Sequence, residues 1–194
     1  ALLLALMAFG SGFLTVSCAP GGYGRAAPGA TTTYTGADLA TGSEPRVDKP
    51  RPGGATGEDR LSGQPLIALA WLLLAGATVA TIRPWRRPHR TIAALAGSAA
   101  VALAVGEAVA RAELLDRFAY QLSAPLPPGR HASDFIHVGN AFWTSLVAAV
   151  AVTAGHAIVA TRSGTAARTR SADSAPAPSP PGISNRAVWP RRPR

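Results

Sequence analysis

Four long runs almost free of charged residues most constrain what this chain can fold into. They cover residues 1–18, 66–82, 91–110 and 138–161, and Glu107 is the one acid inside them. A helix rises about 1.5 Å per residue, so about 20 apolar residues cross a hydrocarbon core of about 30 Å. Because an isolated segment in lipid satisfies its backbone only as a helix, the runs predict an all-α membrane protein, a bundle of three or four transmembrane helices.

The first run has two interpretations. Residues 1–18 either form the first transmembrane helix or act as a cleaved signal segment. Residues 14–18, LTVSC, resemble the end of a bacterial lipoprotein signal, although Thr15 stands where an aliphatic residue is usual. The resemblance implies removal of residues 1–17 and lipidation of Cys18. As Cys18 is the single cysteine, the chain has no internal disulfide.

The formal net charge of +9 is distributed unevenly and predicts the orientation of the helices. The loop 83–90, RPWRRPHR, holds four arginines and no acid, whereas segments 19–64 and 111–140 each hold equal numbers of basic and acidic residues. Basic residues in short loops beside helix ends stay in the cytoplasm. We therefore expect a multi-pass protein of the cell membrane with the 83–90 loop and the C-terminus on the cytoplasmic side.

The two segments richest in Gly and Pro are expected to be disordered. Segment 19–64, on the outer side, shows no sustained apolar period, and the basic tail 162–194 contains the run SAPAPSPPG. The end of the tail gathers residues that can contact anionic lipid, namely Arg186, Trp189, Arg191, Arg192 and Arg194. A solvated tail that only enforces orientation is the alternative, and nucleic acid is not an expected partner.

Glu107 is an ionisable residue within the third run. It lies 16 residues beyond Thr91, about 24 Å along a helix, and therefore near the outer interface. Arg111 follows at the i+4 position on the same helix face. We expect an interfacial ion pair between the two, with a proton or substrate site as the alternative.

Three polar residues precede the last run at a regular spacing of three. If HASDFIH is helical, His131, Asp134 and His137 spread over about 120° and can surround one divalent cation. The alternative is that Asp134 caps the helix that begins there. Apart from this divalent metal, the sequence predicts no cofactor.

Two further histidines are expected at one level on the cytoplasmic side. His156 lies about 24 Å along the last helix from Asn140, and His89 belongs to the basic loop. Two such histidines can ligate a haem. We disfavour a haem here because His89 is expected in a loop and not on a helix.

No catalytic motif accompanies these residues, and an enzyme is not the favoured class. The sequence lacks G-x-S-x-G, H-E-x-x-H and a Walker loop. Small residues recur four apart, as in Ala93 and Gly97, and let membrane helices approach closely. We expect a non-enzymatic membrane protein that packs with itself or with larger membrane partners. The alternative is an outer-face metal-handling or transport component using Glu107, His131, Asp134 and His137.

Overall fold

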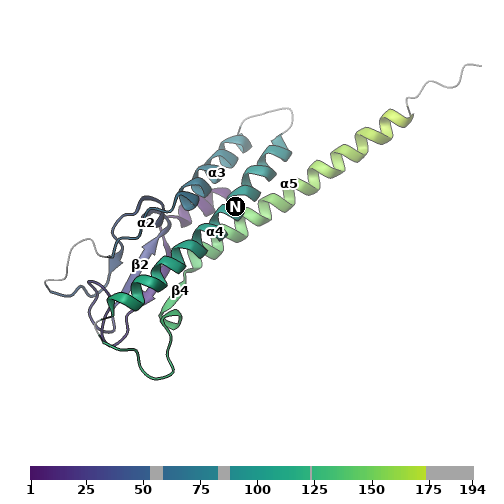
Figure 1. Ribbon diagram of the computed structural model, residues 1–194. Coiled ribbons are helices and arrows are strands. Elements are labelled where there is room, and N and C mark those ends of the chain that lie inside the picture. The colour runs from purple at the N-terminus through teal and green to yellow at the C-terminus, as the bar shows by residue number, and fades with distance from the viewer. Residues whose placement is uncertain (53–58, 83–87, 123, 174–194) are drawn as a thin grey trace, which may run out of the picture. The chain divides into compact units, whose positions relative to one another are not determined.

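The computed structural model describes residues 1–52, 59–82, 88–122 and 124–173. Residues 1–160 form one compact unit, and residues 161–173 are the described part of a second, in which the last helix continues. The elements are drawn in Figure 1. In chain order they are α1 Leu2–Ala8, β1 Gly12–Ser17, β2 Thr31–Thr35, α2 Gly36–Thr41, β3 Arg46–Val47, α3 Pro65–Ile82, α4 Pro88–Gln121, η1 Ala132–Phe135, β4 Ile136–Val138 and α5 Asn140–Asp173.

Helices α3, α4 and α5 are long and apolar enough to cross a membrane, as the sequence predicts. Large apolar side chains point outward from all three, and Leu72, Val101 and Val147 are 60%, 65% and 63% exposed. Exposure to water costs about 25 cal/mol per Å² of apolar surface, a cost that lipid removes. The three helices therefore support a membrane location.

Helices α3 and α4 pack closely because a glycine faces the partner helix. A Cβ atom added to Gly106 in α4 would lie 2.7 Å from a side-chain carbon of Ile67 in α3. The missing side chain thus lets the two backbones approach, as is usual for membrane helices. Leu103, Ala110 and Leu114 of α4 are fully buried.

A four-stranded antiparallel sheet joins three strands from the first 47 residues to β4, which directly precedes α5, in the strand order β3-β2-β1-β4. Leu14 of β1 lies between Tyr34 of β2 and Val138 of β4, and this face of the sheet packs inward. The opposite face carries a cross-strand row of Arg46, Thr33, Thr15 and His137. The alternation follows the two-residue period of a half-buried strand.

The sheet is fixed to the helices at one end of α3, α4 and α5 (Figure 1). The backbone N–H of Gly139, just before α5, donates a hydrogen bond to the carbonyl oxygen of Phe13 in β1, over 2.6 Å. Gly139 leaves no room for a side chain, since a Cβ atom there would collide with the carbonyl oxygen of Gly12. The start of α5 is thereby held against β1.

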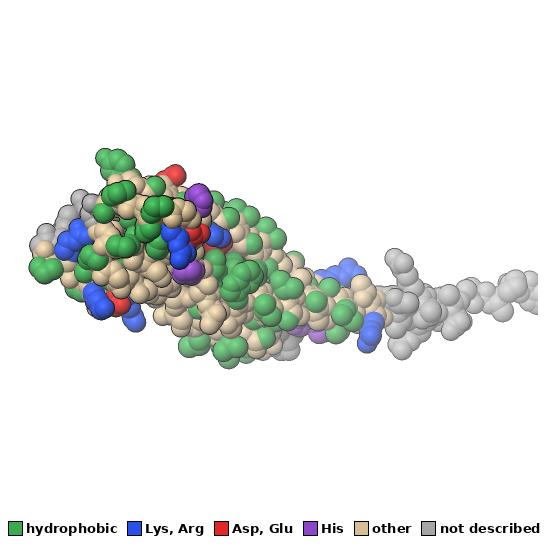
Figure 2. All heavy atoms as spheres, turned by 90° about the horizontal axis from the view of Figure 1, so that it is seen from below, with side chains coloured by type: hydrophobic (Ala, Val, Ile, Leu, Met, Phe, Trp, Pro, Cys, Tyr) green, Lys and Arg blue, Asp and Glu red, His purple; other side chains and the backbone are tan. Residues whose placement is uncertain are grey.

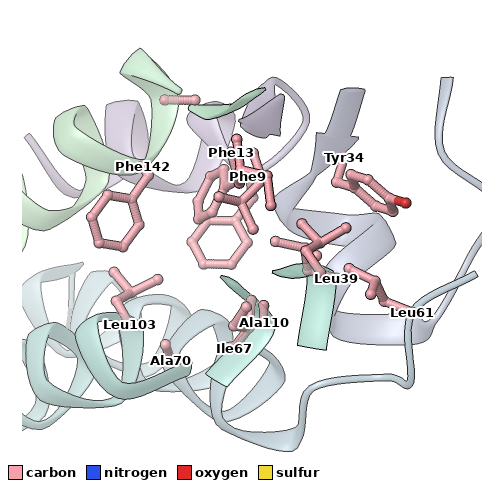
Figure 3. Close-up of a cluster of buried hydrophobic side chains, with 14 of the residues drawn as sticks. Phe9, Phe13, Tyr34, Leu39, Leu61, Ile67, Ala70, Leu103, Ala110 and Phe142 are labelled. Carbon is pink, nitrogen blue, oxygen red and sulfur yellow. The ribbon is translucent and has the colours of Figure 1, made fainter. Parts of the chain in front are cut away.

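Aromatic side chains fill the core between the sheet and the helices, as the close-up in Figure 3 shows. The rings of Phe9 and Phe13 lie 4.9 Å apart, and Phe142 of α5 meets Phe13 edge-on at 6.0 Å. Tyr23, also fully buried, stacks on Phe118 of α4 at 5.3 Å. Aromatic pairs of this kind add about 0.5–1.5 kcal/mol beyond the area that they bury.

The sheet corrects two expectations about the first part of the chain. An all-α fold is wrong, because residues 12–17, expected within a helix over 1–18, form the central strand β1. Gly10 and Gly12 favour the end of α1 at Ala8, and the alternation of Leu14 and Val16 suits pairing with two neighbouring strands.

The expected disorder of 19–64 is also wrong for its described residues, which contain β2, α2 and β3. Thr35 and Asp38 start α2 with a reciprocal capping box, in which Thr35 N–H donates to the Asp38 carboxylate and Asp38 N–H donates to the Thr35 hydroxyl oxygen. Turns accommodate the glycines, so a high Gly content did not prevent folding.

Candidate functional site

Two histidines form a direct side-chain contact between α4 and α5. His89 lies in the first turn of α4, and its Nδ1 atom is 3.0 Å from Nδ1 of His156 in α5. The two ring centroids are 5.2 Å apart, and the ring planes are tilted by 31°. Because both ring nitrogens lie at hydrogen-bond distance, one of them donates and the other accepts.

Helices α4 and α5 also approach each other closely nearer the middle of α4. A Cβ atom added to Gly97 would lie 3.3 Å from the Cγ2 atom of Thr153 in α5. The Thr153 hydroxyl donates to the carbonyl oxygen of Ala149 in its own helix, so its methyl group faces α4 without leaving a polar group unsatisfied. Gly97 therefore serves an internal helix contact.

The expectation that His89 lies in a loop is wrong, because α4 begins at Pro88 and includes His89. Proline is favoured at the first position of a helix, where the missing N–H has no partner to lose. The sequence placed His89 and His156 at one level, but it did not predict their contact. The remainder of the basic loop, residues 83–87, lies outside the described residues.

Two imidazoles can share a proton or ligate a transition metal. A zinc site takes four ligands, of which a catalytic site takes three from the protein. Within the described residues, no three His, Cys, Asp or Glu side chains gather as a metal-binding group. The pair therefore stands as a hydrogen-bonded unit of two rings.

The predicted divalent-metal residues at the sheet end do not converge. His131 and His137 are exposed, and His137 lies on the outer face of the sheet opposite Thr15. The Asp134 carboxylate accepts a hydrogen bond from the backbone N–H of His131, over 3.0 Å, at the start of η1. Asp134 thus has the capping role that the sequence offered as the alternative, for a 3-10 turn and not for the long helix.

The expected ion pair between Glu107 and Arg111 is replaced by one of the same spacing further along α4. Among the described residues no ion pair within 4.0 Å includes Glu107 or Arg111, whereas a guanidinium nitrogen of Arg117 lies 2.7 Å from Glu113. A buried carboxylate oxygen of Glu107 has no hydrogen-bond partner. Glu107 is half-buried on α4, so this side chain is not fully enclosed.

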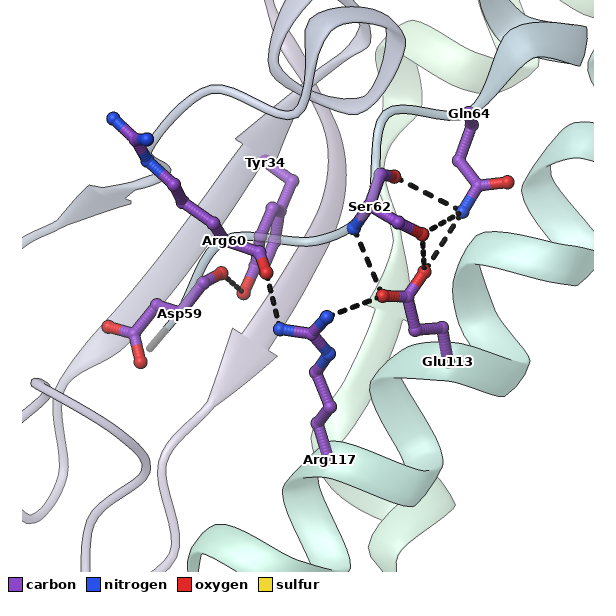
Figure 4. A network of polar contacts seen from close by, with 7 residues as sticks. All are labelled: Tyr34, Asp59, Arg60, Ser62, Gln64, Glu113 and Arg117. Atoms are coloured by element: carbon purple, nitrogen blue, oxygen red, sulfur yellow. Dashed lines mark hydrogen bonds and ion pairs between the residues drawn. The ribbon is translucent and has the colours of Figure 1, made fainter. Parts of the chain in front are cut away.

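Glu113 is the centre of a polar network that the sequence did not predict (Figure 4). Its carboxylate accepts hydrogen bonds from the backbone N–H and the hydroxyl of Ser62, at 3.0 and 2.6 Å, and from the Gln64 amide at 3.0 Å. Arg117 bonds to Glu113 and to the carbonyl oxygen of Arg60. The network therefore holds the segment before α3 against the C-terminal turns of α4.

A second buried acid lies beside this network. The Asp59 carboxylate accepts from the backbone N–H and the side chain of Arg25, and its carbonyl oxygen accepts from the Tyr34 hydroxyl over 2.9 Å. Because each of these groups is paired within the protein, the cluster holds the fold together and offers no open position for a ligand. The i,i+4 spacing of Glu113 and Arg117 was the signal in the sequence for part of it.

Comparison with protein-family models, curated protein sequences and solved structures finds no match.

Cys18, the residue predicted for lipidation, directly follows β1 and is 8% exposed. Its backbone N–H donates to the carbonyl oxygen of Ala30 over 2.8 Å, and burial raises the pKa of its thiol. The side chain therefore contributes to the core. The predicted lipid contacts Arg186, Trp189, Arg191, Arg192 and Arg194 lie outside the described residues.

The charged side chains have a clear distribution on the face drawn in Figure 2. Acidic side chains appear there only at the sheet end, while hydrophobic side chains cover the helices. On α3 no residue is charged, and α5 has no charged residue before Arg162. The histidine pair therefore occupies a part of the molecule poor in groups that balance a charge.

Proposed function

We propose that this chain is a non-enzymatic, multi-pass membrane protein that associates with a second copy of itself through the outward face of α4. One observation carries the proposal, a groove of about 460 Å³ open along the surface of α4. Leu66 of α3 borders the groove, and the small or branched residues Gly97, Ser98, Val101, Ala102 and Val105 of α4 line it. Such residues let another helix approach closely.

The exposed residues beside the groove have the spacing of a helix-packing seam. Ala94, Ser98, Val101, Val105 and Ala108 are all exposed, and they follow one another at intervals of four, three, four and three. This alternation repeats every 3.5 residues on average and supports left-handed packing at about 20° between helix axes. Glu107 lies on the other side of α4 and does not interrupt the seam.

A second copy is the occupant that these features favour. In a parallel pair, the α4 helix of another copy has the same depth in the membrane, so Ser98 and Val101 meet their counterparts. Such a two-fold interface uses the same surface on both subunits and closes after two copies. A partner of different sequence needs a matching seam at the same depth.

Disulfide cross-linking tests the proposal in native membranes or lipid nanodiscs. We expect Val101→Cys in a Cys18→Ser background to form linked dimers on mild oxidation. Val150→Cys, on an exposed position of α5, is the matched control and should stay monomeric. Absence of cross-links at Val101, or equal cross-linking at both positions, overturns self-association through α4. Copurification of the monomer with another membrane protein would favour a larger partner instead.

We propose that the sheet lies on the outer side of the membrane, with the 83–90 loop and the C-terminus in the cytoplasm. The four arginines of the loop support this orientation. A cysteine at Thr15, on the outer sheet face, should react in whole cells with a membrane-impermeant maleimide. Reaction only after cell lysis would reverse the orientation.

The basic tail is proposed to contact anionic lipid, at about 1 kcal/mol per basic residue near the surface. Its five predicted contact residues are the four arginines and the tryptophan between 186 and 194. The full-length protein in nanodiscs of anionic lipid should show slower fluorescence quenching at Trp189 than in neutral lipid, with the other three tryptophans replaced by Phe. Equal quenching in both lipids would contradict this contact.

A further inference from the structure

We infer that the outward face of α1 is a lipid-binding surface, on which Leu3, Leu4 and Met7 contact acyl chains beside the first turns of α3 and α5. The inference rests on the membrane location of the three long helices, but it is independent of self-association, because the surface belongs to α1 and not to the groove on α4. It places the boundary between lipid and water at residues 9–11, which link α1 to β1.

Helix α1 is apolar on every side, but the protein covers only one of its faces. Its sequence is LLLALMA, and Leu2 and Ala5, three residues apart, are buried. Leu3, Leu4 and Met7 lie on the opposite face and are 65%, 61% and 74% exposed. A helix that is apolar all round is normally enclosed by protein or by lipid. The outward face of α1 therefore needs an apolar cover from outside the chain.

The contacts of α1 place it at the depth of a membrane interface. The hydrogen bond from the Ser145 hydroxyl to the carbonyl oxygen of Ala5 lies five residues beyond Asn140, about 7.5 Å along α5. Trp71 of α3 and Trp143 of α5 are both partly exposed within the first two turns of their helices, and indole rings favour the level of the lipid head groups. Helix α1 also packs against α3, as Figure 1 shows. Its residues thus lie where the acyl chains begin.

The end of α1 that leads to β1 has no need of water for its backbone. The last carbonyl oxygens of a helix have no partner within the helix and often bind water. In α1 the carbonyl oxygens of residues 6–8 accept from the backbone N–H groups three residues further on, over 2.9–3.3 Å, and that of Phe9 accepts from Ala37 over 3.1 Å. Backbone groups in lipid must find such partners inside the protein. The end of α1 meets this condition.

Lipid is the occupant that these features favour over a protein, because the exposed apolar surface at this depth is not confined to α1. Leu69 and Leu72 of α3 are 45% and 60% exposed, and Val147 of α5 is 63% exposed. All three lie about 6–11 Å beyond the starts of their helices. A protein partner covers one patch, whereas the hydrocarbon layer covers every apolar side chain at its level.

The accessibility of spin labels tests the contact in lipid nanodiscs. A nitroxide is attached to Met7→Cys in a Cys18→Ser background, and its relaxation is measured with oxygen, which concentrates in lipid, and with a water-soluble Ni(II) chelate. We expect access by oxygen and loss of access by the chelate, as at Leu72→Cys, the lipid-facing reference. Arg46→Cys, on the exposed strand β3, is the matched control in water and should show the reverse.

Leu3→Cys repeats the measurement on the same face, so the test does not depend on the folding of one variant. Labels at both positions that behave like the label at position 46 overturn the inference, because the face is then in water. Labels shielded from both reagents also overturn it, because a second copy or another protein then covers α1. Access of the chelate to position 72 overturns the membrane location itself, a failure that is thereby distinguished from a failure at α1 alone.

Discussion

The hydroxyl of Ser145 in α5 donates a hydrogen bond to the backbone carbonyl oxygen of Ala5 in α1, over 3.2 Å. The same hydroxyl lies 2.9 Å from the carbonyl oxygen of Ala141 in its own helix, and the side chain is fully buried. Residues 140 positions apart in the chain are thus joined inside the core. In an isolated α5 this serine would make no contact outside its own helix, whereas in the folded protein it binds α5 to α1.

Replacing Ser145 by Ala should destabilise the protein by about 0.5–1.5 kcal/mol, because the carbonyl oxygen of Ala5 loses its donor. Thermal unfolding in detergent, followed by circular dichroism, measures the change. Thr144→Ala is the control, since Thr144 is half-buried and its hydroxyl donates to the carbonyl oxygen of Asn140 in its own helix. An equal loss in both variants would contradict a specific role for the Ser145 contact.

Replacing Glu113 by Ala should loosen the segment before α3. Hydrogen bonds to charged groups contribute about 1.5–3 kcal/mol, and partial exposure of Glu113 reduces this to about 1–2 kcal/mol. We expect faster amide hydrogen exchange at Ser62 and Gln64, with the interior of α4 unchanged. Asp116→Ala, at an exposed position one turn further on, should leave the exchange at these residues as it is.

The buried tyrosines should make the fold sensitive to strong base. Burial raises the pKa of Tyr23 to about 12, and burial also raises the pKa of Tyr34, beside which Tyr23 lies. A phenol whose pKa is raised by folding stabilises the native state fully below its unfolded value of about 10, and this contribution is lost as pH rises through the folded pKa. Stability should therefore fall from about pH 10 upward.

Absorbance of the ionised phenol, recorded against pH, follows this transition. Tyr23→Phe should remove the step near pH 12, and Tyr120→Phe, at a residue that is 91% exposed, should keep it. A native protein in which all three tyrosines ionise together near pH 10 would show that Tyr23 and Tyr34 are not buried.

The Cys18 thiol should react slowly with maleimide in the folded protein. Burial blocks access and raises the pKa of the thiol, which lowers the fraction of the reactive thiolate. We expect at least about a tenfold faster reaction after denaturation. Mass spectrometry of the labelled protein measures both rates. A mature chain that carries a lipid on Cys18 would contradict a free thiol buried in the core.

The sequence was sufficient for the three long helices and insufficient for the sheet. Residues 65–82 hold no charged residue and are mostly apolar, so a helix long enough to span a membrane follows from length and composition. In contrast, residues 12–17 continue an apolar run and look like its end. Their strand character depends on β4, about 120 residues further on, and no local pattern shows that partner.

The sequence predicted the common level of His89 and His156 along the helices, but it did not predict the contact between their rings. Counting residues along the last helix placed His156 at the level of the basic loop that holds His89, yet the Pro and Arg residues of that loop obscured the start of α4. Conversely, the even spacing of His131, Asp134 and His137 indicated a metal that their placement on a turn and a strand does not support. Spacing predicts convergence only when the element is known.

The central position of β1 has a consequence for how the chain matures. One of its neighbours, β2, follows within 20 residues, but the other, β4, is made only after α3 and α4. Pairing over so long a loop is slow, because the entropy of closing the loop is lost before the contacts form. During synthesis the free edge of β1 therefore stays open until two hairpin-forming helices have entered the bilayer, and this interval is when the nascent chain is most exposed to misassembly.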